Sequence, residues 1–484
     1  MYNIPIYRSI GVRLTYGYSV FAITTLLFSA LALAFTSPVD IAERVPATEF
    51  ISLATAKPIL DKMASVLPSA LKEAHPLDAD AWNAWVRSED AEIRKRLERG
   101  EEDTLTNLLR FGVTYTKEYR IDREYLSSYG HSTLVDSFAQ NRADDLIRAL
   151  RSPSANPGMQ EMRSFLQRKG FSFETPADRA AIKKYLLANL ARMRDEFNAY
   201  REKIKTAGQS ELSELYSDRG ISLDTNLWPD YDLDQQLQHL IASGVLKPGS
   251  IRRIAVVGPG LDFANKEAGN DYYAPQTTQP FAILDSLLRL KVADPSSLKL
   301  YTLDISPLVN IHVQRIHKAA LAGQPYTVQL TWNSTVPRAE EYLAGFNAYW
   351  QAWGGQIGVA VPPIPPPAAT AAELRVRAVK IRPDIVSRVS PIEMNIVFQH
   401  VSLPQDQQFD LIIGTNVFIY YGPFEQSLAR ANLAAMLNPG GLVLTNELLA
   451  DAAPGKLPEL TRTTITTSSD PLITQTIFCY RREP

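Results

Sequence analysis

The 484-residue sequence contains a single cysteine, Cys479, and only six histidines. One cysteine excludes an intramolecular disulfide and a cysteine-rich zinc site. The sequence has no HExxH or CxxC motif and its histidines are scattered, so we predict no metal centre. An excess of basic residues is also missing: 50 Lys and Arg stand against 52 Asp and Glu, a formal charge of -2. Because nucleic-acid binding requires a net basic surface, we do not expect nucleic acid as a partner.

The overall composition is that of a globular protein. Apolar residues make up 45% of the chain and charged residues 21%, which excludes global disorder and a fibrous coiled coil. At this length, two or three domains are expected.

The first 39 residues carry a membrane signal. Residues 14–39 contain no charge, and residues 20–35 (VFAITTLLFSALALAF) are nearly all apolar. Arg8 and Arg13 precede this run and no acid appears before Asp40. The pattern is typical of a signal peptide or a single N-terminal membrane anchor.

We expect a membrane-associated protein whose contact with the membrane runs through residues 17–37. The small residues Ala30, Ala32 and Ala34 also offer a cleavage site, so export after signal cleavage is the alternative. The positive-inside rule favours a cytoplasmic N-terminus, with the rest of the chain on the other side.

Residues 40–215 are predicted to form an all-helical domain. Thr175 and Asp178 flank Pro176 as a capping box. One apolar stripe then marks a long helix, with Ile182, Leu186, Leu190, Met193, Phe197, Tyr200 and Ile204. The run Glu92–Asp103 mixes both charges and is interpreted as a solvated helix face.

Residues 216–484 alternate apolar strands with helices. The predicted strands, each buried on both faces, are Ile254–Val257, Leu300–Leu303, Phe409–Ile413 and Leu442–Leu444. The helices between them include Phe281–Leu290 and Phe424–Leu437. This alternation predicts an α/β domain with a doubly wound parallel sheet. The Pro-rich stretch 354–370 is interpreted as a surface loop.

Three features follow predicted strands, at the edge of a parallel sheet where ligands bind. Gly258 and Gly260 end the first strand, where missing side chains allow a ligand to approach the backbone. Asp304 ends the second strand, where a carboxylate can accept hydrogen bonds from ribose hydroxyls, although it could instead cap the next helix. Asn416 follows the FDLII strand, and Asp410 near its start is expected to stabilise that start.

These motifs resemble those of the class I S-adenosylmethionine-dependent methyltransferases, over about residues 230–484. VVGPG is similar to their glycine-rich motif, LDIS to their acidic motif, and FDLIIGTNVFIYY to their fourth-strand motif. LNPGGLVLTNE resembles the segment that leads into their fifth strand, and TIFCYRR their antiparallel seventh strand. The segment 416–421 particularly resembles the chemoreceptor glutamate methyltransferases.

The resemblance implies a Rossmann-like fold of the class I methyltransferase type and methyl transfer from S-adenosylmethionine to an unknown acceptor. Gly258, Gly260 and Asp304 would bind the cofactor. Asn416 and Tyr420 are candidates for the acceptor side, although Tyr420 could be a packing residue, and no catalytic residue is assigned.

Several departures from the family pattern keep alternatives open. The family's third glycine would fall at Asp262, and 46 residues separate Gly258 from Asp304, where a compact unit has about 20. The excess, residues 262–280, is either a lid or a surface excursion. A second insert precedes the FDLII strand, so Asp384 is only a guess for the acid that binds adenine.

Two other functions compete with the methyltransferase. A nicotinamide-dependent oxidoreductase would need a small residue where Phe263 stands. The stronger alternative is a non-catalytic, methyltransferase-like binding or scaffold protein of the cell envelope. The missing third glycine favours it, as does a predicted export signal on a protein that would use a cytoplasmic cofactor.

Overall fold

The computed structural model describes residues 46–484, except 74–76, 153–156, 205–218, 224–226, 262–270, 272, 334–339, 367–373, 452–456, 470–473 and 484. Its contacts separate residues 1–44 from one compact unit, Val45–Pro484. The predicted signal peptide or anchor (1–39) lies outside the described residues. Within the described part, no helix has both the length and the apolar character that crossing a membrane requires.

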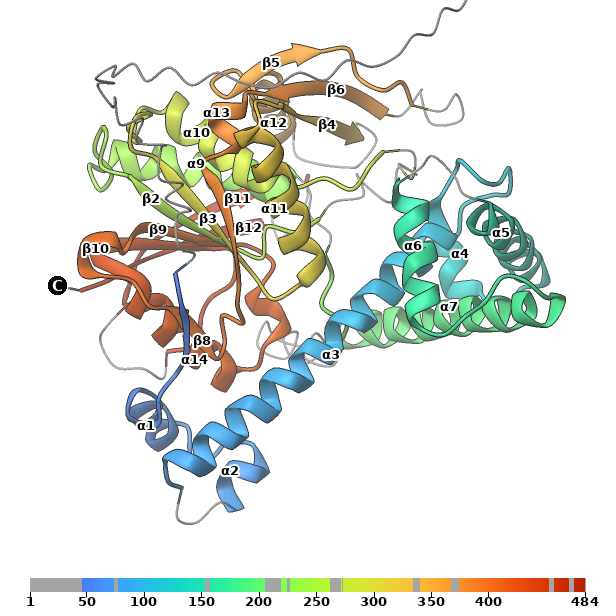
Figure 1. Cartoon of the computed structure of the whole chain (residues 1–484), viewed down its shortest axis with the longest axis horizontal. Helices are drawn as coiled ribbons and strands as arrows, with labels where there is room; N and C mark the ends of the chain where they lie inside the picture. The colour runs from blue at the N-terminus through green and yellow to red at the C-terminus, as the bar shows by residue number, and fades with distance from the viewer. Residues whose placement is uncertain are drawn as a thin grey trace, which may run out of the picture. The chain divides into compact units, whose positions relative to one another are not determined.

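A seven-stranded sheet forms the centre of the compact unit (Figure 1). All four predicted strands are in it; three are one or two residues longer than predicted, and the strand predicted at Leu442–Leu444 begins earlier, at Leu437. In spatial order the strands are β11 (Glu459–Thr466), β12 (Thr474–Arg481), β10 (Leu437–Thr445), β9 (Phe409–Gly414), β2 (Arg253–Val257), β3 (Lys299–Asp304) and β7 (Val389–Glu393).

Five of these strands are parallel, and their order confirms the predicted doubly wound sheet. Numbered along the chain, β7, β3, β2, β9 and β10 give the order 3-2-1-4-5, as in a Rossmann-type sheet. Strand β12 then pairs antiparallel with β10, with Leu442 opposite Arg481. This antiparallel strand is the TIFCYRR segment, as the resemblance implied.

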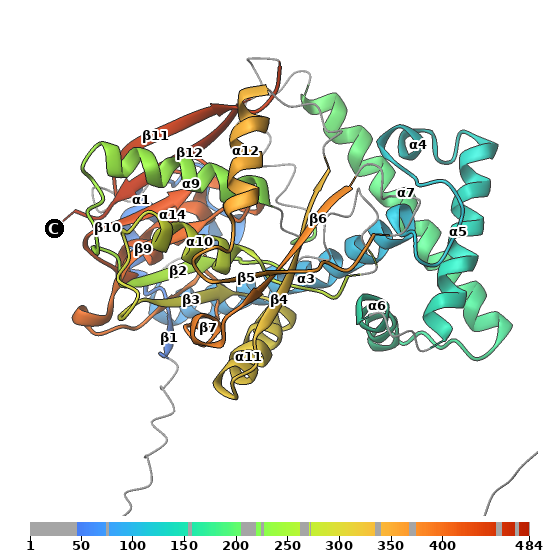
Figure 2. The same cartoon turned by 90° about the horizontal axis from the view of Figure 1, so that it is seen from above.

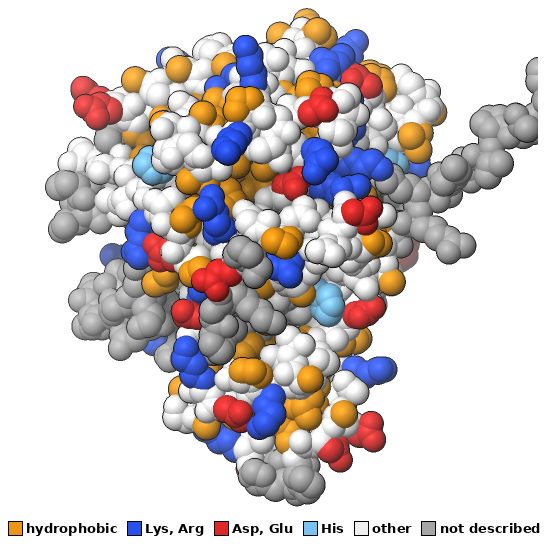
Figure 3. Space-filling view, turned by 90° about the vertical axis from the view of Figure 1, so that its left-hand side faces the viewer, with side chains coloured by type: hydrophobic (Ala, Val, Ile, Leu, Met, Phe, Trp, Pro, Cys, Tyr) orange, Lys and Arg blue, Asp and Glu red, His pale blue; other side chains and the backbone are white. Residues whose placement is uncertain are grey.

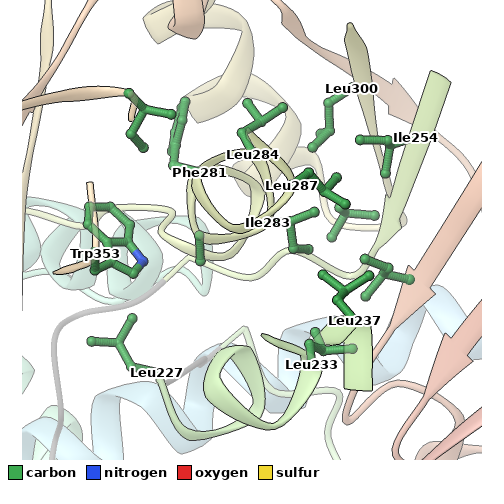
Figure 4. Packing of buried hydrophobic residues seen from close by; sticks show 14 of the residues in the cluster. Leu227, Leu233, Leu237, Ile254, Phe281, Ile283, Leu284, Leu287, Leu300 and Trp353 are labelled. Carbon is green, nitrogen blue, oxygen red and sulfur yellow. The ribbon is translucent and has the colours of Figure 1, made fainter. Parts of the chain in front are cut away.

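Helices cover both faces of the sheet because successive side chains of its strands point to opposite faces. Ile254 and Val256 of β2 face a cluster formed with α9 (Leu227–Ala242), α10 (Gln279–Arg289) and α11 (Pro307–Leu321). Figure 4 shows Leu233 and Leu237 of α9 near β2, and Leu227 of the same helix beneath Trp353. Ala255 and Val257 face a second cluster.

The second cluster includes a part of the chain that the sequence assigned to the helical half. Its members come from α14 (Pro423–Met436), from α1 (Leu53–Lys62) and from the first half of α3 (Ala79–Phe111). Strand β1 (Thr48–Phe50) also pairs with β8 (Gln399–Val401). Helix α2 (Ser69–Glu73) adds Leu71 to the same cluster. The described residues between 48 and 97 therefore contribute to the core on this face of the sheet.

Four more helices build a third cluster around the second half of α3. They are α4 (Arg123–Ser128), α5 (Thr133–Arg151), α6 (Pro157–Arg168) and α7 (Pro176–Ile204). The predicted capping box is confirmed: Thr175 N–H donates to Asp178 Oδ2, and Asp178 N–H donates to Thr175 Oγ1. Figure 1 shows α3 running from the sheet to these helices. The three-part domain division of the sequence stays a prediction.

The insert between β3 and β7 forms a small second sheet (Figure 2). Its antiparallel strands are β4 (Tyr326–Asn333), β6 (Leu374–Ile381) and β5 (Gly358–Val361), accompanied by α12 (Glu340–Ala352) and α13 (Pro383–Val386). The interpretation of 354–370 as a loop was wrong for residues 358–361, because β5 pairs with β6 and so satisfies its backbone groups there. On the face in Figure 3, acidic and basic side chains are interspersed.

Candidate functional site

A pocket opens at the carboxyl ends of β2, β3, β7 and β9. Strands β3 and β9 lie on either side of β2, so the direction in which the chain winds reverses between β2 and β9. Such a topological switch point is where open α/β sheets bind ligands. All five residues that the sequence nominated line this pocket: Gly258, Gly260, Asp304, Asn416 and Tyr420.

The glycines form the turn after β2 because both need a left-handed backbone. Gly258 has φ +62° and Gly260 has φ +72°, a region that side chains disfavour. The Gly258 N–H donates to the carbonyl of Leu303 at the end of β3 (2.9 Å). A Cβ at Gly258 would come within 2.6 Å of Val417 Cγ2. At the two glycines, therefore, no side chain covers the backbone beside the pocket, and neighbouring atoms pack closely against it.

Asp304 ends β3 with its carboxylate buried; the residue is 7% exposed. Its Oδ1 accepts a hydrogen bond from the Ser306 N–H (2.7 Å) just before α11, so it also supports the start of that helix. Burial raises the pKa of Asp304 to about 7; the Ser306 hydrogen bond opposes this rise, and the nearby Glu393 charge adds to it. A carboxylate this poorly solvated gains most from a ligand that donates hydrogen bonds to it.

The segment after β9 forms the opposite wall. Asn416 adopts a left-handed backbone with φ +59°. A reciprocal pair of bonds holds it there: Asn416 N–H donates to Asn446 Oδ1 (2.8 Å), and Asn446 Nδ2 donates to Asn416 Oδ1 (2.7 Å). Tyr420 is partly exposed in the pocket, whereas Tyr421 is buried beneath it and its pKa is raised by burial.

Helix α3 closes one side of the pocket, which the sequence did not predict. Arg94 donates to the Ile305 carbonyl (3.4 Å) and pairs with Glu393 (2.9 Å), so it ties α3 to the ends of β3 and β7. Arg96 donates to the Tyr420 carbonyl (3.0 Å). The interpretation of Glu92–Asp103 as a solvated face was therefore wrong for these two arginines. Their partners come from distant loops, which charge patterning along one segment does not reveal.

The segment before α9 completes this side. Ile221 N–H donates to the Arg96 carbonyl (3.1 Å), and the Leu261 N–H donates to the Leu223 carbonyl (2.7 Å). Ile221 also packs onto α3 at Gly100, where a Cβ would overlap the Ile221 carbonyl oxygen. These contacts hold residues 221–223 across the pocket.

An apolar slot adjoins Asp304. Ile305 follows it directly, Met394 and Ile396 follow β7, and Leu97 of α3 also lines the pocket. Apolar side chains of this kind suit an aromatic base. The guess of Asp384 for a base-binding acid was wrong, because Asp384 lies in α13, before β7, at the amino edge of the sheet. It pairs there with Arg382 (3.1 Å).

Two further buried or partly buried acids lie in or next to the strands. Asp410 Oδ2 accepts from the backbone N–H groups of Arg252 (2.7 Å) and Arg253 (3.0 Å), so it stabilises the strand start as predicted. Glu447, which the sequence analysis missed, follows β10. Burial raises its pKa to about 8, and its carboxylate lies against the backbone of Asn416.

The described end of the insert 262–280 is a buried connection. Asp271 accepts from the backbone N–H groups of Val113 (2.9 Å) and Thr114 (3.1 Å) beyond α3. The Tyr273 hydroxyl donates to the Ile364 carbonyl (2.9 Å) after β5. These contacts join the insert to the helical part on one side and to the small sheet on the other. Residues 262–270 lie outside the described part.

The sequence matches no protein-family model and no curated protein. Solved structures with a similar fold include the N-methyltransferase NodS from Bradyrhizobium japonicum WM9 in complex with S-adenosyl-L-homocysteine. The two sequences are 13% identical. The match covers 57% of this chain and 98% of NodS, with a TM-score of 0.25. The magnesium protoporphyrin IX methyltransferase ChlM from Synechocystis PCC 6803, with S-adenosylmethionine bound, is 12% identical, with 60% and 96% covered and a TM-score of 0.26.

The glycopeptide N-methyltransferase MtfA, complexed with S-adenosylmethionine, is also similar. It is 12% identical, with 53% of this chain and 67% of that chain covered and a TM-score of 0.19. At such TM-scores the likenesses carry no argument about function.

Proposed function

We propose that this chain is an S-adenosylmethionine-dependent methyltransferase. The observation that carries the proposal is the pocket at the switch point: a bare glycine turn and a buried carboxylate, Asp304, lie beside an apolar slot. Asp304 would accept hydrogen bonds from the ribose hydroxyls, Ile305 and Met394 would contact the adenine, and the Gly258 turn would lie against the amino-acid end. The 3-2-1-4-5 strand order with an antiparallel β12 supports the same assignment.

When bound, the cofactor supplies an electrophilic methyl group on a sulfonium. The chain's contribution is to bind and orient it, to exclude water and to place an acceptor in line. Thr415 and Asn416 directly follow β9 and line the pocket, and β2 lies between β9 and the strand that Asp304 ends. We therefore place the acceptor near them.

The pocket is narrow, and the cavity between its walls measures about 80 Å³. A bound cofactor would therefore contact α3, residues 221–223 and the Tyr420 side chain. The small cavity also favours the alternative function, a non-catalytic binding or scaffold protein that keeps the fold without the cofactor.

Titration calorimetry separates the two functions. S-adenosylmethionine and S-adenosylhomocysteine are titrated into the full-length chain in detergent, and into its Asp304→Ala and Asp384→Ala variants. We expect saturable binding that Asp304→Ala weakens at least tenfold and that Asp384→Ala leaves unchanged, because Asp384 lies at the opposite edge of the sheet. Folded protein that binds neither compound would refute the methyltransferase and leave the scaffold function.

We further propose that residues 17–37 attach the protein to a membrane. The support is the uncharged run 14–39 with Arg8 and Arg13 before it. Resistance to carbonate extraction would distinguish an anchor from a cleaved signal. A reporter fused after residue 484 reports the side of the membrane, and the cofactor proposal requires the cytoplasmic side.

A further inference from the structure

Buried polar atoms without partners gather beside the acceptor edge of the pocket, at the amino end of α10. Thr277, Thr278 and Gln279 are each no more than 2% exposed. Both threonine hydroxyls and Gln279 Oε1 have no hydrogen-bond partner in the described part of the chain. Buried polar groups are normally hydrogen-bonded, so each orphan calls for an explanation.

Gln279 connects this group to the pocket. Its Nε2 donates to the Thr415 hydroxyl (2.8 Å), and Thr415 lines the pocket at the end of β9. Gln279 also interacts with Asp230, which lies in the first turn of α9. Helix α9 packs against α10 (Figure 4). Asp230 is 2% exposed, and neither of its carboxylate oxygens has a hydrogen-bond partner of normal geometry among the described residues.

Among the described residues no cation balances Asp230, whereas its neighbour one turn on has one. Asp234 pairs with Arg289 of α10, and Asp232 accepts a hydrogen bond from the Tyr342 hydroxyl (2.8 Å). Among described groups, only the Gln279 amide offsets the burial of Asp230, and the Asp232 charge opposes it. An uncompensated carboxylate at this depth is strongly disfavoured unless it is protonated or a ligand supplies the charge.

The hydrogen-bonding character of these unpartnered atoms indicates the class of ligand that they would bind. Asp230 Oδ1, Asp230 Oδ2 and Gln279 Oε1 are oxygens that only accept when the carboxylate is ionised. A carboxylate or phosphate ligand would be repelled there, whereas an ammonium group brings both the opposite charge and several N–H donors.

We propose that the methyl acceptor is an amine, which Asp230 and Gln279 bind beside Thr415. This inference rests on the proposed function. The amine enters as an ammonium and gives one proton to Asp230. Its freed lone pair then forms the N–C bond to the methyl carbon as the C–S bond breaks, and the bonding pair stays on sulfur. Asp230 later releases the proton to solvent.

Burial raises the pKa of Asp230 to about 7, so the residue can exchange that proton near neutral pH. The ionisable groups around it are Asp232 and Asp234 on its own helix, Arg289 on α10, and the Tyr349 hydroxyl on α12. Burial raises the pKa of Tyr349 well above its usual value. Asp230 therefore changes charge between pH 6 and pH 8.

Sinefungin tests the assignment, because an amine-bearing carbon replaces the methylsulfonium in this analogue. Affinities for sinefungin, S-adenosylmethionine and S-adenosylhomocysteine are measured on the full-length chain and on Asp230→Asn. We expect the wild type to prefer sinefungin over S-adenosylhomocysteine by about tenfold at pH 8, as for one charge-assisted hydrogen-bonded pair. Asp230→Asn should remove this preference without changing the other two affinities.

The matched control is Asp232→Asn, an equally buried acid of the same helix, which should keep the preference. An unchanged preference in Asp230→Asn would overturn the proposal. An equal loss of S-adenosylmethionine affinity would also overturn it, because Asp230 would then face the sulfonium rather than an acceptor. Absence of S-adenosylhomocysteine binding in the wild type would instead refute the proposed function itself.

The wild type provides a second arm that does not depend on the folding of a variant. Its preference for sinefungin over S-adenosylhomocysteine should fall from pH 8 to pH 6 as Asp230 takes up a proton. Asp304 titrates in the same range, but it acts on both ligands and cancels in the ratio. Glu447→Gln should retain the pH dependence, and a flat ratio in the wild type would contradict the amine assignment.

Discussion

Replacing Asp304 with asparagine should strengthen the ligand-free fold while weakening the site. Burial raises the pKa of Asp304 from 3.8 to about 7, so the folded chain holds this proton more tightly than the unfolded chain. Stability therefore falls as the pH rises from about 4 to about 7. A pKa unit is worth about 1.36 kcal/mol, which sets a ceiling of about 4 kcal/mol.

Asp304→Asn removes this penalty and keeps an oxygen for the Ser306 N–H. Since the surroundings of a buried charge relax, we expect about 1–2 kcal/mol of the ceiling. The measurement is the free energy of unfolding in urea, without ligand, at pH 5 and at pH 8. The stability of the variant relative to wild type should be higher at pH 8 than at pH 5 by this amount. Asp230 and Glu447 titrate in both proteins and cancel in the difference.

The same substitution should weaken cofactor binding. Losing the charge on an acceptor costs a hydrogen bond about 1.5–3 kcal/mol, so the Kd of S-adenosylhomocysteine should rise about 10- to 100-fold at pH 8. Asp384→Asn, on an exposed side chain, should change neither quantity. A variant that is destabilised equally at pH 5 and pH 8 would mean that the Asp304 carboxylate is ionised and well satisfied in the fold, and the reasoning would fail.

Three further substitutions test the walls and the core. Gly258→Ala forces a Cβ onto a backbone with φ +62° and against a neighbouring valine. We expect the free energy of unfolding in urea to fall by about 1–3 kcal/mol and the cofactor to bind more weakly. Full cofactor affinity would contradict the idea that the ligand approaches the backbone at Gly258. Gly100→Ala should push residues 221–223 off α3, which a lower Tm and faster proteolysis near residue 220 would report; an unchanged pattern would refute the contact. Trp82→Ala empties a fully buried site and should cost about 3–5 kcal/mol; a loss below 1 kcal/mol would show that the start of α3 does not belong to the sheet core.

Local patterns in the sequence determined the α/β half well. Ile254–Val257 and Phe409–Ile413 are apolar on both faces, which only a strand covered on two sides tolerates, and both became central strands. Gly258, Gly260 and Asp304 could be nominated because they directly follow such strands, and parallel strands bring their carboxyl ends to one edge.

Only the tertiary structure decided which other groups lie at that edge. Arg94 reads locally as one more charge on a mixed helix face, yet α3 brings it to Ile305 and Glu393, about 200 and 300 residues further along the chain. Asp384 lies in the expected interval of the sequence, between β3 and β9. It precedes β7, however, and so lies at the amino edge of the sheet rather than at the carboxyl edge. Asp230 shows the same limit: nothing in the sequence around it singled it out, and only the packing of α9 buries it. Periodicity and propensity act over a few residues, whereas desolvation depends on which distant segments cover a side chain, and that information exists only in the folded chain.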